Sequence, residues 1–423
     1  MKLSTPQNVQ KLRKALYERA KREPNLRFYS LYDKIHRDDV LAHAYALSRA
    51  NKGAAGPDGV TFEDIERGEG AGSVIARLAK ELKTKQYKPG PVRRVYIPKA
   101  NGGERPLGIP DIRDRVVAMA VKLVLEPIFE ADFDSDSYGF RPARNAHQAL
   151  AAIRESIADG MTWVVDADVS KCFDSIPHDK LMRTVASRVV DGSLLALVKM
   201  FLTAPVVDER DGGRRTRPRA GTPQGGPASP LLANIYLHLL DRNFRMHVER
   251  GDLQGRLVRY ADDFVIVCPR HPRRERAWAD GLMSRLGLTL HPEKTRVVNV
   301  GTEWVNFLGY RIRRRPNGRV ALDIAVKTMS RIRDRLRVTT RRTFLSLAEL
   351  ISELNLYTRG ASEYFQHAEP RTLWKLDRFV LARIARWARH KRVRRLPEWS
   401  LARGTVLYRE HGLATWWRRK KPT

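Results

Sequence analysis

Two adjacent carboxylates, Asp262 and Asp263, interrupt an apolar stretch that is rich in β-branched residues. Residues 256–260 precede them and residues 264–268 follow them, and each flank has the composition of a β-strand. We therefore expect a hairpin with the two acids at its turn. Neighbouring negative charges need a compensating cation, and paired hard oxygen ligands suit Mg²⁺, which in pairs promotes in-line phosphoryl transfer. A polar surface turn is the alternative interpretation.

A third carboxylate comes from a short apolar segment, residues 163–169. Successive side chains of a strand point to opposite faces, so Asp166 and Asp168 share one face. Charged residues are poor strand formers, and two of them on one face favour a site over an exposed sheet edge. The alternation does not choose between Asp166 and Asp168.

Both acidic segments resemble the acidic motifs of reverse transcriptases, the first over residues 168–178 and the second over residues 260–263. Further segments are similar to group II intron reverse transcriptases and follow in the same order along the chain: residues 93–110, 137–142, 221–230, 286–295 and 306–310. The resemblance covers about residues 25–400. On these seven motifs, the chain is identified as a member of the group II intron-encoded reverse transcriptases and maturases.

The resemblance implies an α+β fold. This fold is a right-hand polymerase, whose fingers and palm carry a mixed or antiparallel sheet, followed by an all-α thumb or maturase domain. The implied domains are an N-terminal extension (1–65), fingers with the start of the palm (66–160), a palm with the catalytic acids (161–315), the thumb or maturase domain (326–395) and a short basic tail (396–423). The tail contains no Cys-x-x-Cys pair, so we expect the form that lacks the endonuclease domain.

Hydrophobic periodicity predicts the principal elements. Residues 92–98 and 105–109 are predicted to form a hairpin. An amphipathic helix is predicted over residues 115–130, and beyond residue 318 the pattern predicts helices only. Other helices are predicted over residues 75–85, 194–202 and 231–249.

The family resemblance assigns two Mg²⁺ ions to Asp168, Asp262 and Asp263, and it adds Val169 to the metal-binding set. One ion would activate the primer 3′-hydroxyl and the other would neutralise charge on the nucleotide phosphates. Asp168 matches the family's first acid better than Asp166, because the aromatic residue five positions later is Phe173.

Five residues are implied to contact the incoming nucleotide: Lys99, Arg105, Phe173, Gln224 and Lys294. Phe173 would lie under the sugar and exclude a 2′-hydroxyl, although ordinary core packing is the alternative. Lys99 and Arg105 flank a Gly-Gly turn and suit a triphosphate clamp, or else belong to a solvated basic loop. Gln224 would contact the nucleotide, and Lys294 would lie near its phosphates, where it could donate a proton to pyrophosphate.

Charge supports a nucleic-acid partner independently of the motifs. The 423 residues include 79 Lys and Arg against 47 Asp and Glu, a net charge of +32 that favours binding to a polyanion. Residues 325–423 alone contain 24 basic and 8 acidic residues. Within them Arg383, Arg386 and Arg389 recur at helical spacing and are predicted to bind nucleic acid from one face.

Tryptophans lie between these basic residues. We expect Trp374 and Trp387 to pack in the core of a small helical domain, whereas residues 416–421, which begin with Trp416 and Trp417, are the candidate DNA-binding patch of the tail.

Composition disfavours several classes of protein. No run of about 18 apolar residues predicts a transmembrane helix, and the N-terminus has no apolar signal stretch. Cys172 and Cys268 lie beside the acidic motifs rather than in a spaced set, which argues against a disulfide scaffold or a zinc site. We therefore expect a cytoplasmic protein with no membrane partner.

The motifs together predict an RNA-directed DNA polymerase. Its implied partners are an RNA template, a DNA primer, deoxynucleoside triphosphates and a group II intron RNA that it helps to splice and retrohome, with target DNA as a further partner. Two alternatives stay open: a host-adopted reverse transcriptase acting in repair or defence, and an RNA-binding splicing factor with an unused polymerase site. A missing catalytic acid would favour the splicing factor, and none is missing.

Overall fold

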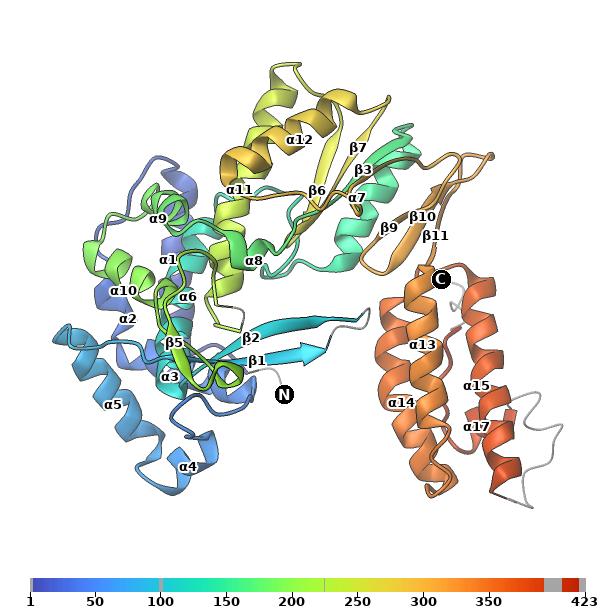
Figure 1. Cartoon of the computed structure of the whole chain (residues 1–423), viewed down its shortest axis with the longest axis horizontal. Coiled ribbons are helices and arrows are strands. Elements are labelled where there is room, and N and C mark those ends of the chain that lie inside the picture. The colour runs from blue at the N-terminus through green and yellow to red at the C-terminus, as the bar shows by residue number, and fades with distance from the viewer. Residues whose placement is uncertain (1–2, 99–101, 224, 392–404, 418–423) are drawn as a thin grey trace. The chain divides into compact units, whose positions relative to one another are not determined.

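The computed structural model describes residues 3–98, 102–223, 225–391 and 405–417. It is an α+β structure (Figure 1), as the sequence predicts. The chain divides into two compact units. The first comprises Met1–Asn145, Ala167–Val265 and Arg273–Thr295, and the second comprises Ala146–Asp166, Ile266–Pro272 and Arg296–Thr423.

The N-terminal 200 residues are mainly helical. In chain order the elements to α10 are α1 (Gln7–Arg22), α2 (Tyr32–Ile35), α3 (Asp38–Ala50), α4 (Phe62–Arg67), α5 (Gly70–Lys83), β1 (Val92–Pro98), β2 (Glu104–Pro110), α6 (Ile112–Glu130), α7 (Ala146–Ala158), β3 (Trp163–Asp168), α8 (Cys172–Ser175), α9 (His178–Ala186) and α10 (Gly192–Leu202).

Strands are more frequent in the middle of the chain, and helices follow them. The remaining elements are β4 (Val206–Asp208), η1 (Glu209–Asp211), β5 (Arg214–Thr216), α11 (Ser229–Glu249), β6 (Arg256–Tyr260), β7 (Asp263–Cys268), α12 (Arg273–Leu286), β8 (Arg296–Asn299), β9 (Val305–Phe307), β10 (Tyr310–Arg314), β11 (Val320–Ile324), α13 (Val326–Thr339), α14 (Leu347–Tyr364), α15 (Pro370–His390) and α17 (Thr405–Arg409).

The first sheet has the strand order β2-β1-β4-β5. Strands β1 and β2 form the predicted antiparallel hairpin, in which Val92 is opposite Pro110 and Pro98 is opposite Glu104. Strand β4 joins β1 in parallel and turns back into β5. Figure 1 shows the hairpin as the long pair of arrows labelled β1 and β2.

Helix α6 differs from its prediction. It is buried along almost its whole length rather than on one face, and it packs against α1 and α3. Asp114 and Arg115 are charged and yet buried, because neighbouring groups bond to them. Tyr87 donates a hydrogen bond to Asp114 at 2.6 Å, and Arg115 donates to the carbonyls of Pro110 and Ala54. The prediction of an amphipathic helix over residues 115–130 relied on the spacing of the apolar residues, which does not show that Arg115 is buried as well.

The acidic segments belong to a four-stranded sheet with the order β6-β7-β3-β8. Strands β6 and β7 are the two arms predicted around the Asp-Asp turn. Strand β3 is antiparallel to β8, with Trp163 opposite Asn299 and Asp166 opposite Arg296. The remaining sheet, β11-β10-β9, includes a strand beyond residue 318, so the prediction of helices only was wrong there. Almost every residue of β11 is buried, which hides the two-residue alternation of a strand.

Helices α13, α14 and α15 belong to the second unit, and α13 packs against the other two. Trp387 is 1% exposed, as predicted, and its indole donates to the carbonyl of Arg342 at 3.1 Å. Trp374, however, is 46% exposed, and the Arg378 guanidinium lies 4.9 Å from its ring centre. The prediction that Trp374 packs in the core was wrong, because it lies beside the buried stripe of α15 rather than in it.

The end of the described chain is part of this helical bundle. Trp416 is 1% exposed, and its backbone N–H donates to Asp377 of α15 at 2.8 Å. The side chain of Asn355 on α14 bonds to the carbonyl of Gly412 and to the N–H of Ala414. Trp416 is therefore not available as a DNA-binding residue, which corrects that prediction. Residues 418–421 of the proposed patch lie outside the described residues.

Within the described ranges, no helix has both the length and the apolar character needed to cross a lipid bilayer.

Candidate active site

A cavity of about 690 Å³ in the first unit brings most of the predicted site residues together. Those that line it are Arg105, Asp168, Val169, Phe173, Asp262, Asp263 and Lys294. Asp166 does not line it, and its carboxylate instead lies 3.7 Å from the Arg296 guanidinium. Lys99 and Gln224 lie outside the described residues. The geometry thus separates two acids that alternation alone left equivalent.

The turn between β6 and β7 has an unusual backbone. Ala261 adopts a left-handed conformation with φ of 59°, which non-glycine residues seldom adopt. Gly139, from the segment 137–142, lies so close that a Cβ there would be 2.3 Å from the Ala261 nitrogen. Two separate motifs therefore fit together only because position 139 has no side chain.

The side chain of Arg259 stabilises this turn through a hydrogen bond to its backbone, and the sequence analysis did not identify this residue. Its side chain is completely buried and donates to both oxygens of Asp241, at 2.8 and 2.5 Å. It also donates to Asn234 and, at 2.8 Å, to the carbonyl of Ala261. The available signal was an arginine inside an apolar strand, together with Asn234 and Asp241 seven residues apart on one face of α11.

The acids lie in different electrostatic surroundings. Burial raises the pKa of Asp262, and the negative charge of Asp168 raises it further, whereas Arg105 and Arg259 lower it. Both carboxylate oxygens of Asp168 lie 3.3 Å from the Lys294 ammonium. This pair is about half exposed, so solvent screens it and its contribution to stability is small.

The donor set fits a hard divalent cation. Three carboxylates line one cavity, and burial raises the pKa of Asp262, with a further contribution from the negative charge of Asp168. Carboxylate oxygens are the protein ligands that Mg²⁺ prefers. In the part of the chain that is described, no three His, Cys, Asp or Glu side chains already stand close enough together to hold an ion. Lys294 is the cation next to Asp168 in this arrangement.

Phe173 lines the cavity and is half-buried. Its ring meets that of Phe140 edge-on, with ring centres 6.3 Å apart. The segment 221–222 crosses directly over its backbone, since the N–H of Thr222 donates to the Phe173 carbonyl at 2.7 Å. A Cβ on Gly221 would lie 2.8 Å from that same carbonyl oxygen, so the crossing requires glycine.

The three arginines of α15 have unequal environments. Arg386 and Arg389 are exposed, but Arg383 is half-buried and donates to the Thr340 hydroxyl at 2.9 Å. Burial lowers the pKa of Arg383, and the charges of neighbouring arginines add to the effect.

Comparison with known proteins decides the family. Residues 97–312 match the family "Reverse transcriptase (RNA-dependent DNA polymerase)", and residues 329–404 match "Group II intron, maturase-specific domain". The protein YkfC of Escherichia coli K12 is 33% identical over 351 residues, which cover 73% of this chain and 89% of YkfC. This chain belongs to the reverse transcriptase family.

Other relatives of this reverse transcriptase are encoded in introns. The group II intron-encoded protein LtrA of Lactococcus lactis subsp. cremoris is 31% identical over 363 residues, 71% of this chain and 59% of LtrA. An uncharacterised 91 kDa protein in the cob intron of Schizosaccharomyces pombe is 31% identical, and the match covers 43% of it. The chain thus spans about half the length of these two relatives.

Among solved structures, the telomerase of Candida albicans matches 77% of the chain and 64% of its own, with a TM-score of 0.44 and 12% identity. A partial Cas6-RT-Cas1–Cas2 complex matches 60% of the chain with a TM-score of 0.37 and 22% identity.

The two family matches and the intron-encoded relative confirm the predicted resemblance to group II intron reverse transcriptases with a maturase domain, and by family the chain is an RNA-directed DNA polymerase.

Proposed function

We propose that this reverse transcriptase copies RNA into DNA with two Mg²⁺ ions held by Asp168, Asp262 and Asp263, with Val169 completing the set. The observation that carries the proposal is that all four residues line one cavity together with cationic side chains. When bound, such ions would activate the primer hydroxyl and neutralise phosphate charge.

The remaining residues bind and orient the nucleotide. Arg105 is exposed at the cavity and close enough to affect the pKa of Asp262, so it is suited to contact the triphosphate. Lys294 carries the positive charge beside Asp168 and is suited to accompany the leaving phosphates. Phe173 forms part of the cavity wall where a 2′-hydroxyl would be excluded. Lys99 and Gln224 remain predicted nucleotide contacts.

The proposed domains are those of a group II intron reverse transcriptase. Residues 1–65 form the N-terminal extension, residues 66–160 the fingers with the start of the palm, residues 161–315 the palm, residues 326–395 the thumb or maturase domain and residues 396–423 a short basic tail. The match of residues 329–404 to the maturase-specific domain and the intron-encoded relatives support a second role. In that role the chain binds its group II intron RNA and assists splicing and retrohoming. Exposed Arg386 and Arg389 are the proposed contacts.

Primer extension on poly(rA)/oligo(dT) with Mg²⁺ tests the site. Asp262→Ala should abolish extension because it removes a central metal ligand, while RNA binding should be largely retained. Asp166→Ala is the matched control, since that acid pairs with Arg296 and does not line the cavity. Equal activity of wild type and Asp262→Ala would refute the assignment. A wild type that binds RNA but never extends a primer would favour the splicing-factor alternative.

A further inference from the structure

The segment that leads into the active-site motif of residues 221–230 has an arginine at every second position. Arg215, Arg217 and Arg219 are exposed and alternate with Thr216 and Pro218. In an extended segment successive side chains point to opposite sides, so alternate residues share a side. Pro218 and Ala220 line the polymerase cavity, whereas the three arginines do not. One side of this segment therefore forms cavity wall, and the other presents a row of cations, the arginine strip (residues 215, 217 and 219).

The strip begins on an edge strand. Strand β5 is last in the order β2-β1-β4-β5, and within the described residues no strand pairs with its outer edge. Its position is nevertheless fixed, because β4 pairs with both β1 and β5. Two contacts join this β4–β5 hairpin to β1 and β2: the Tyr96 hydroxyl donates to Asp208 at 2.5 Å, and Arg210 forms a two-pronged ion pair with Glu104.

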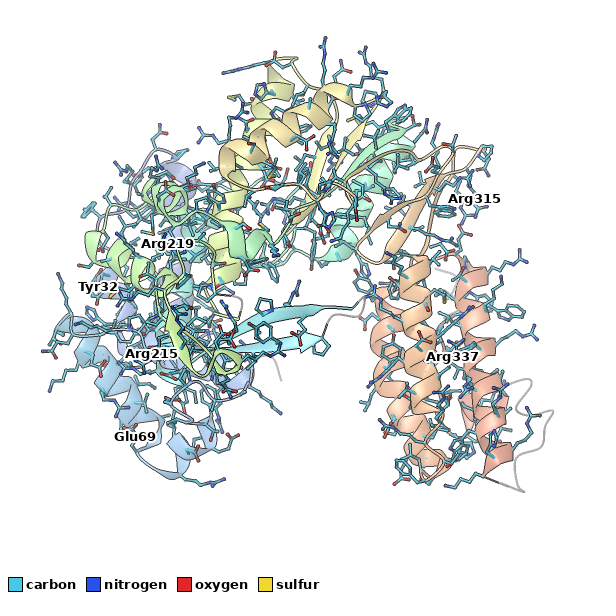
Figure 2. All side chains as sticks on the ribbon, in the orientation of Figure 1. Tyr32, Glu69, Arg215, Arg219, Arg315 and Arg337 are labelled. Atoms are coloured by element: carbon cyan, nitrogen blue, oxygen red, sulfur yellow. The ribbon has the colours of Figure 1, made fainter. Side chains whose placement is uncertain are left out.

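The three guanidinium groups of the strip differ from that of a neighbouring arginine. Arg210, in the same hairpin, pairs with Glu104 and stacks 4.1 Å from the ring centre of Tyr96. Across the part of the chain that the structure describes, the arginine strip has neither an ion pair nor a side-chain hydrogen bond. Figure 2 marks two of its members, Arg215 on β5 and Arg219 on the segment after it. Neighbouring unpaired cations repel one another, so an anion outside the chain would relieve that repulsion.

We propose that the arginine strip binds the phosphate backbone of the single-stranded RNA template as it approaches the cavity. Alternate residues of an extended chain are roughly 6.6 Å apart, which gives a linear row of donors for an extended strand. Arginine binds phosphate with two parallel hydrogen bonds, and cationic grooves follow the backbone of single strands. The inference rests on the proposed function: behind the growing primer end the nucleic acid is a duplex, and ahead of it only the template is single-stranded.

The experiment compares two ligands by fluorescence anisotropy with the full chain. One is an RNA template–DNA primer duplex with an unpaired 5′ RNA overhang, and the other is the same duplex with blunt ends. The triple variant Arg215→Gln/Arg217→Gln/Arg219→Gln should bind the overhang ligand on the order of tenfold more weakly at moderate salt. Its slope of log affinity against log salt should fall by about 2, since each single-strand phosphate contact contributes about 0.7. Affinity for the blunt duplex should not change.

A control variant removes the same charge elsewhere in the first unit. Arg250, Arg273 and Arg274 are exposed and do not line the cavity, so replacing all three with Gln should leave the overhang preference intact. An equal loss in this control, or an equal loss for the blunt ligand, would overturn the proposal. Asp262→Ala should keep the overhang preference while it loses primer extension. If the wild type extends no primer but the triple variant still binds the overhang ligand more weakly, the proposed polymerase function is wrong. The role of the arginine strip in binding single-stranded RNA would then still hold.

Discussion

At the residue scale, the position of the catalytic turn depends on a buried ion pair. Arg259 and Asp241 are both buried, and Arg259 also donates to the carbonyl of Ala261. A buried charge whose partner is removed costs about 3–5 kcal/mol, whereas replacing both partners by apolar groups is often neutral.

We therefore expect Arg259→Met to lower the free energy of unfolding by about 3–5 kcal/mol, and the double variant Arg259→Met/Asp241→Leu to recover much of it. Urea denaturation of the two variants measures this. Primer extension should remain low in the double variant, because the Ala261 carbonyl has still lost its donor. If the double variant is no more stable than Arg259→Met, the two residues do not stabilise the fold as a pair. If the double variant is fully active in primer extension, the pair does not position the turn.

Phe173 also makes a residue-scale prediction. Phe173→Ala should raise incorporation of ribonucleotides relative to deoxyribonucleotides, because it enlarges the cavity wall where the sugar is proposed to lie. Competition between labelled dNTP and rNTP in primer extension gives the ratio. Phe140→Ala is the control, since its exposed ring touches Phe173 without lining the cavity. If both variants change the ratio of ribonucleotide to deoxyribonucleotide incorporation equally, Phe173 only packs against its neighbours and does not select the sugar.

Single residues also show which parts of the site could be predicted from the sequence. Acids inside apolar strands are visible without knowledge of the fold, so Asp262, Asp263 and one of Asp166 and Asp168 could be proposed from local chemistry. The family resemblance, through Phe173, was needed to choose Asp168. Arg259 could not be assigned, because its partners Asn234 and Asp241 come from a helix that only the fold brings close. Trp374 and Trp387 illustrate the same limit, since only the stripe that α15 buries distinguishes them.

At the element scale, hairpins and most helices could be predicted from the sequence. The burial of an element and the groups that bond to it could not. The β1–β2 hairpin and α11 follow from turn residues and periodicity. For α6 the period was correctly helical, but its charged residues bond to loops far away in the sequence, so its burial could not be inferred. The C-terminal strap, residues 412–417, has no pattern of its own, because its backbone bonds to side chains of α14 and α15.

The strap gives a prediction at this scale. Asp377 accepts hydrogen bonds from the Thr415 hydroxyl and from the N–H groups of Trp416 and Trp417, at 2.8, 2.8 and 3.0 Å. Asp377→Ala should leave buried donors unsatisfied and cost about 2–4 kcal/mol, with earlier proteolysis near residue 410 and a shift in tryptophan emission as Trp416 becomes exposed.

Asp334→Ala provides the comparison for this experiment. It removes an exposed ion pair with Arg337 three residues along α13, and such pairs contribute less than about 1 kcal/mol. If the two variants unfold at the same denaturant concentration, the strap does not stabilise the bundle, and the burial of Trp416 must rest on other contacts.

At the scale of the whole molecule, charge and function agree. A net charge of +32 opposes compaction, yet arginines form ion pairs with acids inside each unit, as Arg259 does with Asp241 in the first and Arg311 with Asp323 in the second. The cations that remain exposed are therefore the ones available to RNA. Arg386 and Arg389 belong to that group, whereas Arg383 is engaged with Thr340.

RNA affinity should accordingly fall steeply as salt is raised, because each phosphate contact releases counterions. Arg386→Gln/Arg389→Gln should reduce the slope of log affinity against log salt by about 1 to 2, with thermal stability unchanged. Arg383→Gln should instead lower thermal stability, since it removes the bond to Thr340, and should alter the slope little. Filter binding of a structured RNA between about 0.05 and 0.2 M salt measures the slopes. A salt-independent affinity, or a slope that only the Arg383 variant changes, would contradict the proposed role of this helix face.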